Sequence, residues 1–519
     1  KLNEKQTENL SKTEQKINEL MAKDQLTKGD ALKMMRLIEK QQREEEKQSD
    51  EKKSLEVPLT QRKTEYVDSA FKQTENAWDT LRAVPLTEKE RSLYVKNDSI
   101  KNAPKTESDT TKNRKQPKGT LGKILLNTSY AKLKNKNIEF KLPGLLITNA
   151  FFNPVDGYLI DRELFMWKYN FKSQRSIGFI PTAQYSFARK TFMGNLNLNS
   201  FYAPKARGTI RVNIGKLNDD FNNNNPMSAF MNAITTLTLV DNYKRLYHKE
   251  FFNISNTIDI SNGLTLGTSF EYAKRFEMQN NSTYKMFNPY QREYEENIPF
   301  DGIDSSLVQS HNASFLKTSI SYTPQYYFRL DGRKKVMLYS KYPTFTATVT
   351  QGLKGIMNSI TDYTLAEFSI SQSKKLGLID NINYYVGSGK FISKNTLKFA
   401  DYKHFNTIPF ILGGRTSTNT FRLLDYYTSS SSDYYLEAHL GIEDNNILLK
   451  RIPFFGRKAW TESLRVSCLT NENTSNYMEL GYGLNKLFLF LNIEAYASFY
   501  TFKYQSFGVK ILLNFMTNN

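Results

Sequence analysis

The sequence predicts an all-β protein that crosses a membrane as a barrel of about sixteen antiparallel strands, with about fourteen as the alternative, preceded by a small α-helical periplasmic region. Many segments alternate apolar and polar side chains, which suits strands with lipid on one face and water on the other. No run of about 20 apolar residues occurs, so helical membrane spans are excluded. The 31 Tyr and 35 Phe residues, against 3 Trp, suit aromatic girdles at membrane interfaces.

The last segment, residues 505–515, shows the alternation most clearly. Its predicted lipid face carries an apolar side chain at every second position: Phe507, Val509, Ile511, Leu513 and Phe515. Small or polar residues occupy the other face, with Leu512 as the one apolar exception. We interpret this segment as the strand that closes the barrel, with its final aromatic residue at a membrane interface.

The net charge of +19 raises the question of nucleic-acid binding. Lys and Arg are dispersed, however, and no helix-turn-helix, zinc-finger or RNA-binding signature accompanies them, so we expect no nucleic-acid partner. Contacts with anionic lipid head groups or lipopolysaccharide, or a cation-lined lumen, explain the excess more simply. The single Cys468 excludes an internal disulfide. A barrel must be exported and no signal peptide begins at Lys1, so we expect a longer precursor.

Three segments precede the predicted barrel. Residues 1–58 are charge-balanced and helix-forming, which predicts a periplasmic helical hairpin; a solvated hairpin is favoured over a contact surface. Residues 59–100 carry aromatic anchors, and Thr87-x-x-Glu90 predicts a capping box at the start of a short helix. Residues 101–119 contain no apolar residue larger than Ala, which predicts a disordered linker.

We assign residues 120–158 to a segment that leads into the barrel and residues 159–519 to the barrel itself. The predicted strands lie near residues 159–172, 176–190, 192–203, 207–216, 248–260, 263–276, 310–323, 341–352, 361–374, 380–392, 408–412, 433–443, 461–470, 476–486, 487–500 and 505–515.

The connections between these strands come in two sizes. Short turns such as Asn262-Gly263 alternate with long connections at residues 217–247, 277–309 and 413–432, which we expect to face outward. Within the first of these, residues 226–239 are apolar enough to form a small helix packed in or over the barrel.

Several motifs resemble one family. They are Asp-Ser-x-Phe at 68–71, Trp-x-x-Leu-Arg-x-x-Pro-Leu-Thr-x-x-Glu at 78–90, Lys-Asn-Asp-Ser at 96–99, Phe-Asn-Pro-Val-Asp-Gly at 152–157, Tyr-Thr-Pro-Gln at 322–325, Ser-Lys-Tyr-Pro-Thr-Phe at 340–345, Asp-Tyr-Lys-His-Phe at 401–405, Tyr-Leu-Glu-Ala-His at 435–439 and Lys-Arg-Ile-Pro at 450–453. Their order resembles a Bacteroidota outer-membrane β-barrel family of unknown function, which usually carries an N-terminal carboxypeptidase-regulatory-like domain. The resemblance covers about residues 60–519.

That family resembles a distant branch of the outer-membrane assembly (BamA-like) superfamily, whose barrels fold an Arg-containing loop into the lumen. The resemblance implies an inward loop here with Gly413, Gly414 and Arg422. The superfamily's Arg-Gly-aromatic triplet is absent, because Leu423 follows the Arg, and no polypeptide-transport-associated repeats are visible upstream. We expect the Arg422 guanidinium to bind lumen acids, with a surface contact to lipopolysaccharide phosphates as the alternative.

The sequence shows no catalytic, cofactor-binding or metal-binding motif, so we expect no enzyme activity and no cofactor. Its four histidines lie on separate predicted strands or loops: His248, His311, His404 and His439. Glu437 and His439 share one strand face, and a carboxylate in lipid is costly, so we assign both to the lumen. Together with Glu479 they are the predicted lumen partners, and a hydrogen-bonded network is favoured over a catalytic pair.

One predicted outward connection, residues 277–309, is rich in carboxylates. Calcium binding and a solvated loop are the two interpretations, and the solvated loop is favoured. The carboxylates are Glu293, Glu295, Glu296, Asp301 and Asp304.

The sequence therefore predicts an outer-membrane protein with its N-terminal region in the periplasm. We expect it to assist assembly, export or anchoring of other envelope or surface proteins. Its expected partners are other outer-membrane or periplasmic proteins, together with outer-membrane lipid and lipopolysaccharide. A passive or ligand-gated pore for small solutes is the alternative.

Overall fold

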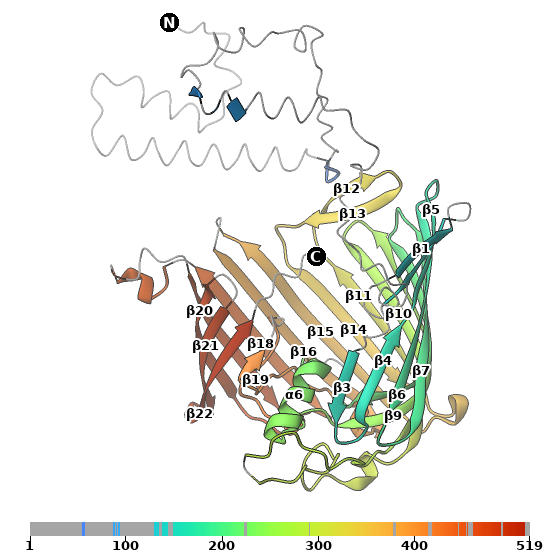
Figure 1. Ribbon diagram of the computed structural model, residues 1–519, viewed down its shortest axis with the longest axis vertical. Helices are drawn as coiled ribbons and strands as arrows, with labels where there is room; N and C mark the ends of the chain where they lie inside the picture. The colour runs from blue at the N-terminus through green and yellow to red at the C-terminus, as the bar shows by residue number, and fades with distance from the viewer. Residues whose placement is uncertain are drawn as a thin grey trace, which may run out of the picture.

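The structure is a computed structural model with one continuous sheet as its main feature (Figure 1). It describes residues 54–57, 87–88, 90, 92–93, 129–133, 137–143 and 149–513, except 223–225, 290, 377–379, 414–417, 445, 453, 455–459 and 489–490. The predicted linker, nearly all of the predicted helical hairpin, Gly414 and Phe515 lie outside the described residues.

The described chain contains many strands and few helices. The strands are β1 (Ser129–Leu133), β2 (Ile138–Leu142), β3 (Asn149–Asn153), β4 (Gly157–Glu163), β5 (Phe165–Asn170), β6 (Arg175–Ser186), β7 (Thr191–Ala203), β8 (Gly208–Asp220), β9 (Leu246–Ser261), β10 (Leu264–Phe276), β11 (His311–Tyr322), β12 (Tyr327–Asp331), β13 (Lys334–Tyr339), β14 (Thr344–Gly352), β15 (Asp362–Lys375), β16 (Asn381–Thr396), β17 (Leu412–Gly413), β18 (Tyr434–Asp444), β19 (Thr461–Asn471), β20 (Tyr477–Leu487), β21 (Leu491–Tyr500) and β22 (Lys503–Leu513). The helices are α6 (Ala229–Leu239) and the 3-10 turns η4 (Ser305–Leu307), η5 (Ile356–Asn358), η6 (Phe399–Asp401) and η7 (Leu449–Arg451).

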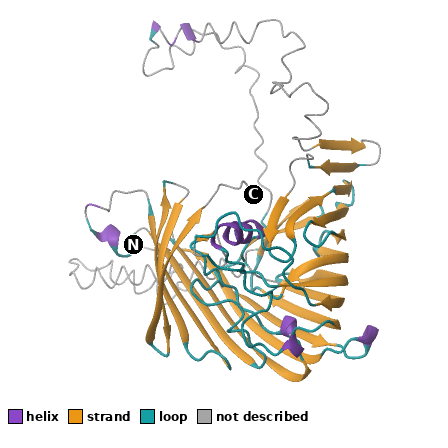
Figure 2. Cartoon of the chain, turned by 60° about the horizontal axis from the view of Figure 1, so that its bottom comes forward, coloured by secondary structure: helices purple, strands orange, loops and turns teal. Residues whose placement is uncertain are grey.

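Twenty of the strands form one sheet in which all pairings but one are antiparallel. From β6 to β11, from β14 to β16 and from β18 to β22, each strand pairs with the next in sequence. The pairs β11–β14 and β16–β18 join these three runs of strands to one another. The resulting sheet is strongly curved, with α6 and the connections around it at one end and the β12–β13 hairpin at the other (Figures 1 and 2).

The sheet is not closed, which corrects the prediction of a closed barrel. Among the described residues, no backbone pairing joins β22 to β1, β2, β3 or β4. The free edge of β22 pairs instead with β17, in parallel, over two residues, and Ile511 N donates to Ile411 O at 2.7 Å. The strand predicted to close the barrel is therefore an edge strand over its described residues 503–513, which include Phe507, Val509, Ile511 and Leu513. Two residues of a loop of the same chain pair with its second side.

The number of strands also differs from the predicted sixteen, for identifiable reasons. The predicted strand 159–172 is split into β4 and β5 at Leu164, and β3 and β2 pair with these two parts in turn. The predicted strand 408–412 is wrong, since only Leu412–Gly413 pair and Pro409 has no N–H to donate. The hairpin β12–β13 was not predicted, although its Asp331-Gly332 turn is a strong hairpin signal.

Side-chain burial on β22 follows the alternation of the sequence. Phe507 is 60% exposed and Val509 38%, whereas Lys510 is 3% exposed and Leu512 4%. The apolar exception Leu512 thus faces the concave side with Lys510. Across the sheet, exposed large apolar side chains gather on the convex side in the same way, as Leu436, Leu440, Leu464 and Leu480 illustrate.

The concave side holds most of the core. One cluster joins Phe405, Phe421 and Leu424, from the connection between β16 and β18, to the inner faces of β18, β19 and β20. A second cluster joins Phe399 and Tyr427 to side chains near the ends of β8 and β9. The predicted small helix is confirmed as α6, which packs against β3 and begins with a Ser228 cap. None of the described helices is long and apolar enough to span a membrane.

The connection between β18 and β19 folds toward the convex side. Glu462 shares the outward face of β19 with Leu464, yet it is fully buried. Its carboxylate accepts hydrogen bonds from Ile447 N, Leu448 N, Lys450 N and the Tyr482 hydroxyl. This arrangement leaves three apolar side chains of the connection exposed, namely Leu448, Ile452 and Phe454.

Two pieces of the N-terminal region are described. Glu56 forms a parallel bridge with Phe328, so residues 54–57 extend the β12–β13 hairpin. The capping box is confirmed, because Glu90 Oε2 accepts from Thr87 N at 2.9 Å and Glu90 N donates to Thr87 Oγ1 at 3.4 Å.

An arginine scan of β18 tests whether the convex side faces lipid. Leu440→Arg, at mid-strand, should lower the free energy of unfolding by about 2–4 kcal/mol in lipid, whereas Tyr434→Arg at the strand end should cost about 0–1 kcal/mol. Both positions are exposed on the same face, so the pair is matched. Urea titration of protein folded into vesicles gives the two values, and equal values would show that this face does not contact the bilayer core.

Candidate functional site

The connection between β16 and β18, residues 397–433, lies on the concave side of the sheet and is called the inward loop. It doubles back on itself, because Lys403 pairs with Ser431 and Thr407 pairs with Phe421. Hydrophobic residues of both halves pack on the inner faces of the strands. The loop therefore has a defined path through the interior of the sheet.

Glu479 on β20 holds the backbone of the inward loop. Its carboxylate accepts hydrogen bonds from Arg422 N at 2.7 Å, Leu423 N at 2.8 Å and Leu424 N at 3.0 Å. Tyr477 donates its hydroxyl to the same carboxylate at 2.7 Å. Hydrogen bonds to a charged group contribute about 1.5–3 kcal/mol each, so this residue is a strong anchor of the loop backbone.

Arg422 is 2% exposed and points into the sheet. Its Nη2 lies 3.8 Å from Glu494 Oε2 on β21, and Glu494 also binds Arg465 Nε at 3.2 Å. The sequence named Glu437 and Glu479 as partners of the guanidinium. In the structure, Glu479 accepts from the backbone N–H of Arg422. The side chain of Arg422 lies next to a different acid, Glu494.

Glu437 and His439 lie side by side on the buried face of β18. His439 Nε2 is 3.5 Å from Glu437 Oε2, and its Nδ1 is 2.9 Å from Ser467 Oγ. The cation near Glu437 is Lys403 of the inward loop, with Nζ 3.9 Å from Oε1. These two residues are thus brought to the inward loop, but at its Lys403 end and not at Arg422.

Two further ion pairs fasten the loop, and the sequence did not predict either of them. Lys403 Nζ binds Glu367 on β15 at 3.0 Å, and Asp401 binds Arg275 on β10 at 2.8 Å. Asp401 and Arg275 are both almost fully buried, so the pair is shielded from water. The sequence did contain a signal for these partners: a charged residue at an inward position of an alternating strand. Arg275, Glu367 and Glu494 all share it.

The loop reaches the edge strand β22 near Pro409. Lys510 Nζ donates to Pro409 O, and the backbone of Ile411 accepts from Ile511 as described above. Gly413 belongs to the paired residues of β17, while the neighbouring Gly414 lies outside the described residues. The site is therefore a buried tether that runs from β10 and β15, across β18, β20 and β21, to the free edge of β22.

Small residues on β20 make room for the buried acids. A Cβ atom at Gly481 would lie 2.3 Å from a ring carbon of Tyr496, and one at Gly483 would lie 2.9 Å from Glu494 Cγ. Either contact is too short for a carbon atom, so glycine at both positions permits Glu494 and Tyr496 to occupy the concave side.

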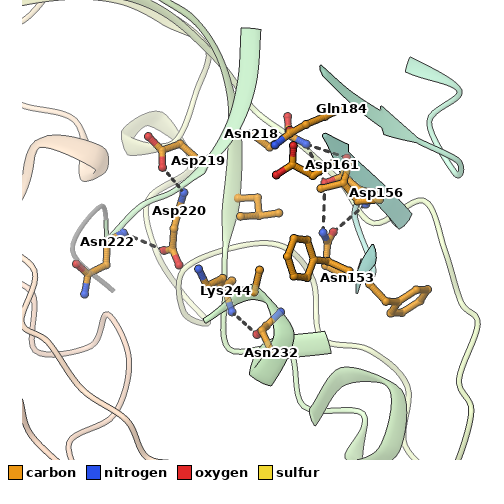
Figure 3. Close-up of a pocket in the computed structure, with 15 residues that line it drawn as sticks. Asn153, Asp156, Asp161, Gln184, Asn218, Asp219, Asp220, Asn222, Asn232 and Lys244 are labelled. Carbon is orange, nitrogen blue, oxygen red and sulfur yellow. Dashed lines mark hydrogen bonds between the residues drawn. The ribbon is translucent and has the colours of Figure 1, made fainter. Parts of the chain in front are cut away.

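The second polar site is a cavity of about 300 Å³ near α6, shown in Figure 3. Its base is Asp156, which accepts from Asn218 Nδ2 at 2.8 Å and Asn153 Nδ2 at 3.2 Å and pairs with Arg189 at 3.3 Å. Gly157 follows with φ of 65°, which favours glycine in the β3–β4 turn. The cavity is thus built on the Phe-Asn-Pro-Val-Asp-Gly motif.

Neither site carries an evident metal or catalytic group. Throughout the described residues, no group of three or more His, Cys, Asp or Glu side chains is placed to hold a metal ion. His404 bonds to Ser430 Oγ at 2.7 Å and to Phe399 O at 3.0 Å, which is a structural arrangement. In the 277–309 connection, Glu293 and Glu295 pair with Lys285 and Arg245.

Hydrogen exchange tests the anchor at Glu479. Glu479→Gln removes the negative charge that three amides share, so exchange at residues 422–424 should become about 10- to 100-fold faster. Glu472 provides a matched control, because it accepts from Ser432 N and Asp433 N in the same loop. Glu472→Gln should accelerate residues 432–433 and leave 422–424 unchanged, as mass spectrometry of peptides will report. Uniform acceleration in both variants would contradict separate anchors.

Comparisons with solved structures give weak matches. BamA from Haemophilus ducreyi lacking POTRA domains 1–3 is similar over 74% of this chain and 75% of that chain, at 11% identity and a TM-score of 0.37. CdiB from Acinetobacter baumannii matches over 70% and 56% of the chains, at 10% identity and 0.31. A Rhodopseudomonas blastica porin triple mutant matches over 68% and 90%, at 10% and 0.29. Scores this low assign neither a shared fold nor a shared function.

The comparison with protein families is more informative. No curated protein matches the sequence. A family model does match, and it covers residues 122–484, which include β1 to β19 and nearly all of β20. The chain therefore belongs to the family of unknown function DUF5686, whose C-terminal domain the model describes.

Proposed function

We propose that this protein is a non-enzymatic outer-membrane barrel protein that assists assembly, export or anchoring of other envelope or surface proteins, as part of a larger complex. The observation that carries the proposal is the edge of β22. One side of β22 pairs along its length with β21, whereas the other side pairs, among the residues that the structure describes, only with Leu412 and Gly413. An unpaired strand edge is a template for another strand, so a client strand can add there once the inward loop withdraws.

The proposal includes an orientation in the membrane. Residues 54–57 pair with β12 at the end of the sheet opposite α6, and β22 ends on that same side (Figure 1). We assign this end to the periplasm and the end with the three longest connections, at residues 221–245, 277–310 and 397–433, to the outside, since barrels of this kind carry their longer loops outside. The convex apolar face then contacts outer-membrane lipid and lipopolysaccharide.

The proposed partners are other outer-membrane or periplasmic proteins. The motif resemblance adds a Bacteroidota source and a carboxypeptidase-regulatory-like domain upstream of the barrel, which would place a second protein-binding module in the periplasm. Mass spectrometry of proteins that co-purify from solubilised outer membranes identifies these partners.

Locking the inward loop to β22 tests the role of the edge. In a Cys468→Ser background, Leu412→Cys with Ile511→Cys joins two residues that pair across this edge. Cells with only the locked protein should lose a subset of other surface proteins, as cells without the protein do, and reductant should restore them. Quantitative proteomics of outer membranes measures the loss.

The control pair is Leu436→Cys with Thr470→Cys, which links β18 to β19 inside the sheet. This pair should leave the surface proteins at normal abundance. An unchanged outer-membrane proteome in cells that lack the protein altogether would contradict an assembly or anchoring role.

Conductance distinguishes the proposal from the pore alternative. Because the inward loop packs through the concave side, the purified protein should show no steady conductance in planar bilayers. Replacing residues 404–424 with a Gly-Ser linker should open it. Replacing residues 327–339, the β12–β13 hairpin, serves as a control and should not. Steady, solute-selective conductance of the unmodified protein would favour the pore.

A further inference from the structure

A cavity of about 460 Å³ opens at the end of the sheet that carries α6. Three connections form its walls: residues 241–245 after α6, residues 295–301 between β10 and β11, and residues 425–428 of the inward loop. The cavity is distinct from the polar cavity at Asp156. Pro409 of the inward loop, whose carbonyl accepts from Lys510 of β22, also lines it.

The lining of this cavity is strongly acidic, in contrast to the chain as a whole, which carries +19. Its carboxylates are Asp241, Glu295, Glu296, Asp301 and Asp425. Arg245 is the one basic residue among them, and Arg292 lies beside Asp241 at 3.1 Å. The carboxylates therefore outnumber the cations by three, and the last three of them are exposed to incoming ligands.

Aromatic rings form the remaining walls. The rings of Tyr243 and Tyr426 are 5.6 Å apart, and Tyr426 and Tyr427 are also 5.6 Å apart. Burial raises the pKa of Tyr243 to about 12, and the carboxylate of Asp241 adds to the shift, so this residue is neutral at physiological pH. Ring faces next to carboxylates attract ammonium and guanidinium groups and repel anions.

Arg245 supplies an independent indication of a ligand. Its side chain is nine-tenths buried, and Nη2 donates to Glu295. The neighbouring Nη1 is buried without a hydrogen-bond partner in the described structure. A buried donor without an acceptor costs about 1–3 kcal/mol. A ligand that supplies an oxygen acceptor to Arg245, close to the carboxylates, would therefore be stabilised here.

We propose that this cavity binds a lysine- or arginine-containing segment of a partner polypeptide. The basic side chain lies among Glu296, Asp301 and Asp425 and against the tyrosine rings, while a backbone carbonyl of the same segment accepts from Arg245 Nη1. A polypeptide offers both groups at a short spacing. An anionic lipid or phosphate is repelled by the carboxylates, and a neutral sugar leaves their charge uncompensated.

Peptide binding tests the proposal on the full chain in detergent. Fluorescein-labelled pentalysine should bind saturably, as measured by fluorescence anisotropy, and more weakly as salt rises. Glu296→Gln with Asp425→Asn should weaken binding about tenfold or more. Glu277→Gln with Glu293→Gln removes the same charge from the β10–β11 connection outside this cavity and should leave the affinity unchanged.

Competition separates the partner classes. Unlabelled pentalysine should displace the probe, and spermine, which has ammonium groups but no carbonyl, should do so at higher concentration. Pentaglutamate and a neutral oligosaccharide such as maltopentaose should not. Displacement by the oligosaccharide, or equal loss of affinity in the two double variants, would overturn the assignment. These binding measurements test the cavity, whereas the Leu412–Ile511 crosslink tests the edge of β22, so failure of one proposal is distinguishable from failure of the other.

Discussion

Every backbone N–H and C=O group removed from water needs a partner within the protein, and this requirement governs the structure from one edge of the sheet to the other. Interior strands satisfy this requirement by pairing with their neighbours. Because the sheet is not closed, the edge of β22 depends on another segment for its hydrogen bonds. The inward loop provides that segment at β17. To reach it, the loop backbone runs through the concave side, away from bulk water, and therefore needs acceptors there. Glu479 meets this second need by binding three successive amides.

The anchors of the inward loop are spread over several strands, and this distribution determines how the loop can move. Asp401 is bound to β10, Lys403 to β15 and β18, and Arg422 to β21. Each buried charge is costly once its partner is removed, so loosening one end leaves the others in place. In the proposed function, withdrawal from β22 consequently requires a partner that replaces several contacts together. A strand adding at the edge replaces only the backbone contacts of β17, so the charged anchors set the larger part of the barrier.

Much of the sheet could be predicted because the alternation of side chains is local. The segments 176–190, 248–260 and 263–276 agree with β6, β9 and β10 within a few residues, and Asn262-Gly263 marks the turn between the last two. Closure could not be predicted, since alternation identifies the face of each residue but not which edges meet. The partner of Arg422 was missed for a related reason. Glu437, Glu479 and Glu494 are all inward acids, and choosing among them requires the path of a loop whose fold depends on distant strands.

In the proposed membrane setting, the connection between β18 and β19 makes the molecule one-sided. It folds over Glu462 on the convex face and presents Leu448, Ile452 and Phe454 beyond the wall of the sheet. Lipid that contacts these side chains extends past the ends of the strands in this sector, so the hydrophobic belt is taller here than the strands alone would make it. Tilting of the protein reduces the hydrophobic mismatch of such a belt. The tilt turns one sector of the wall toward a thicker leaflet and the opposite sector toward a thinner one. Neighbouring proteins then meet a membrane whose thickness depends on the side from which they approach.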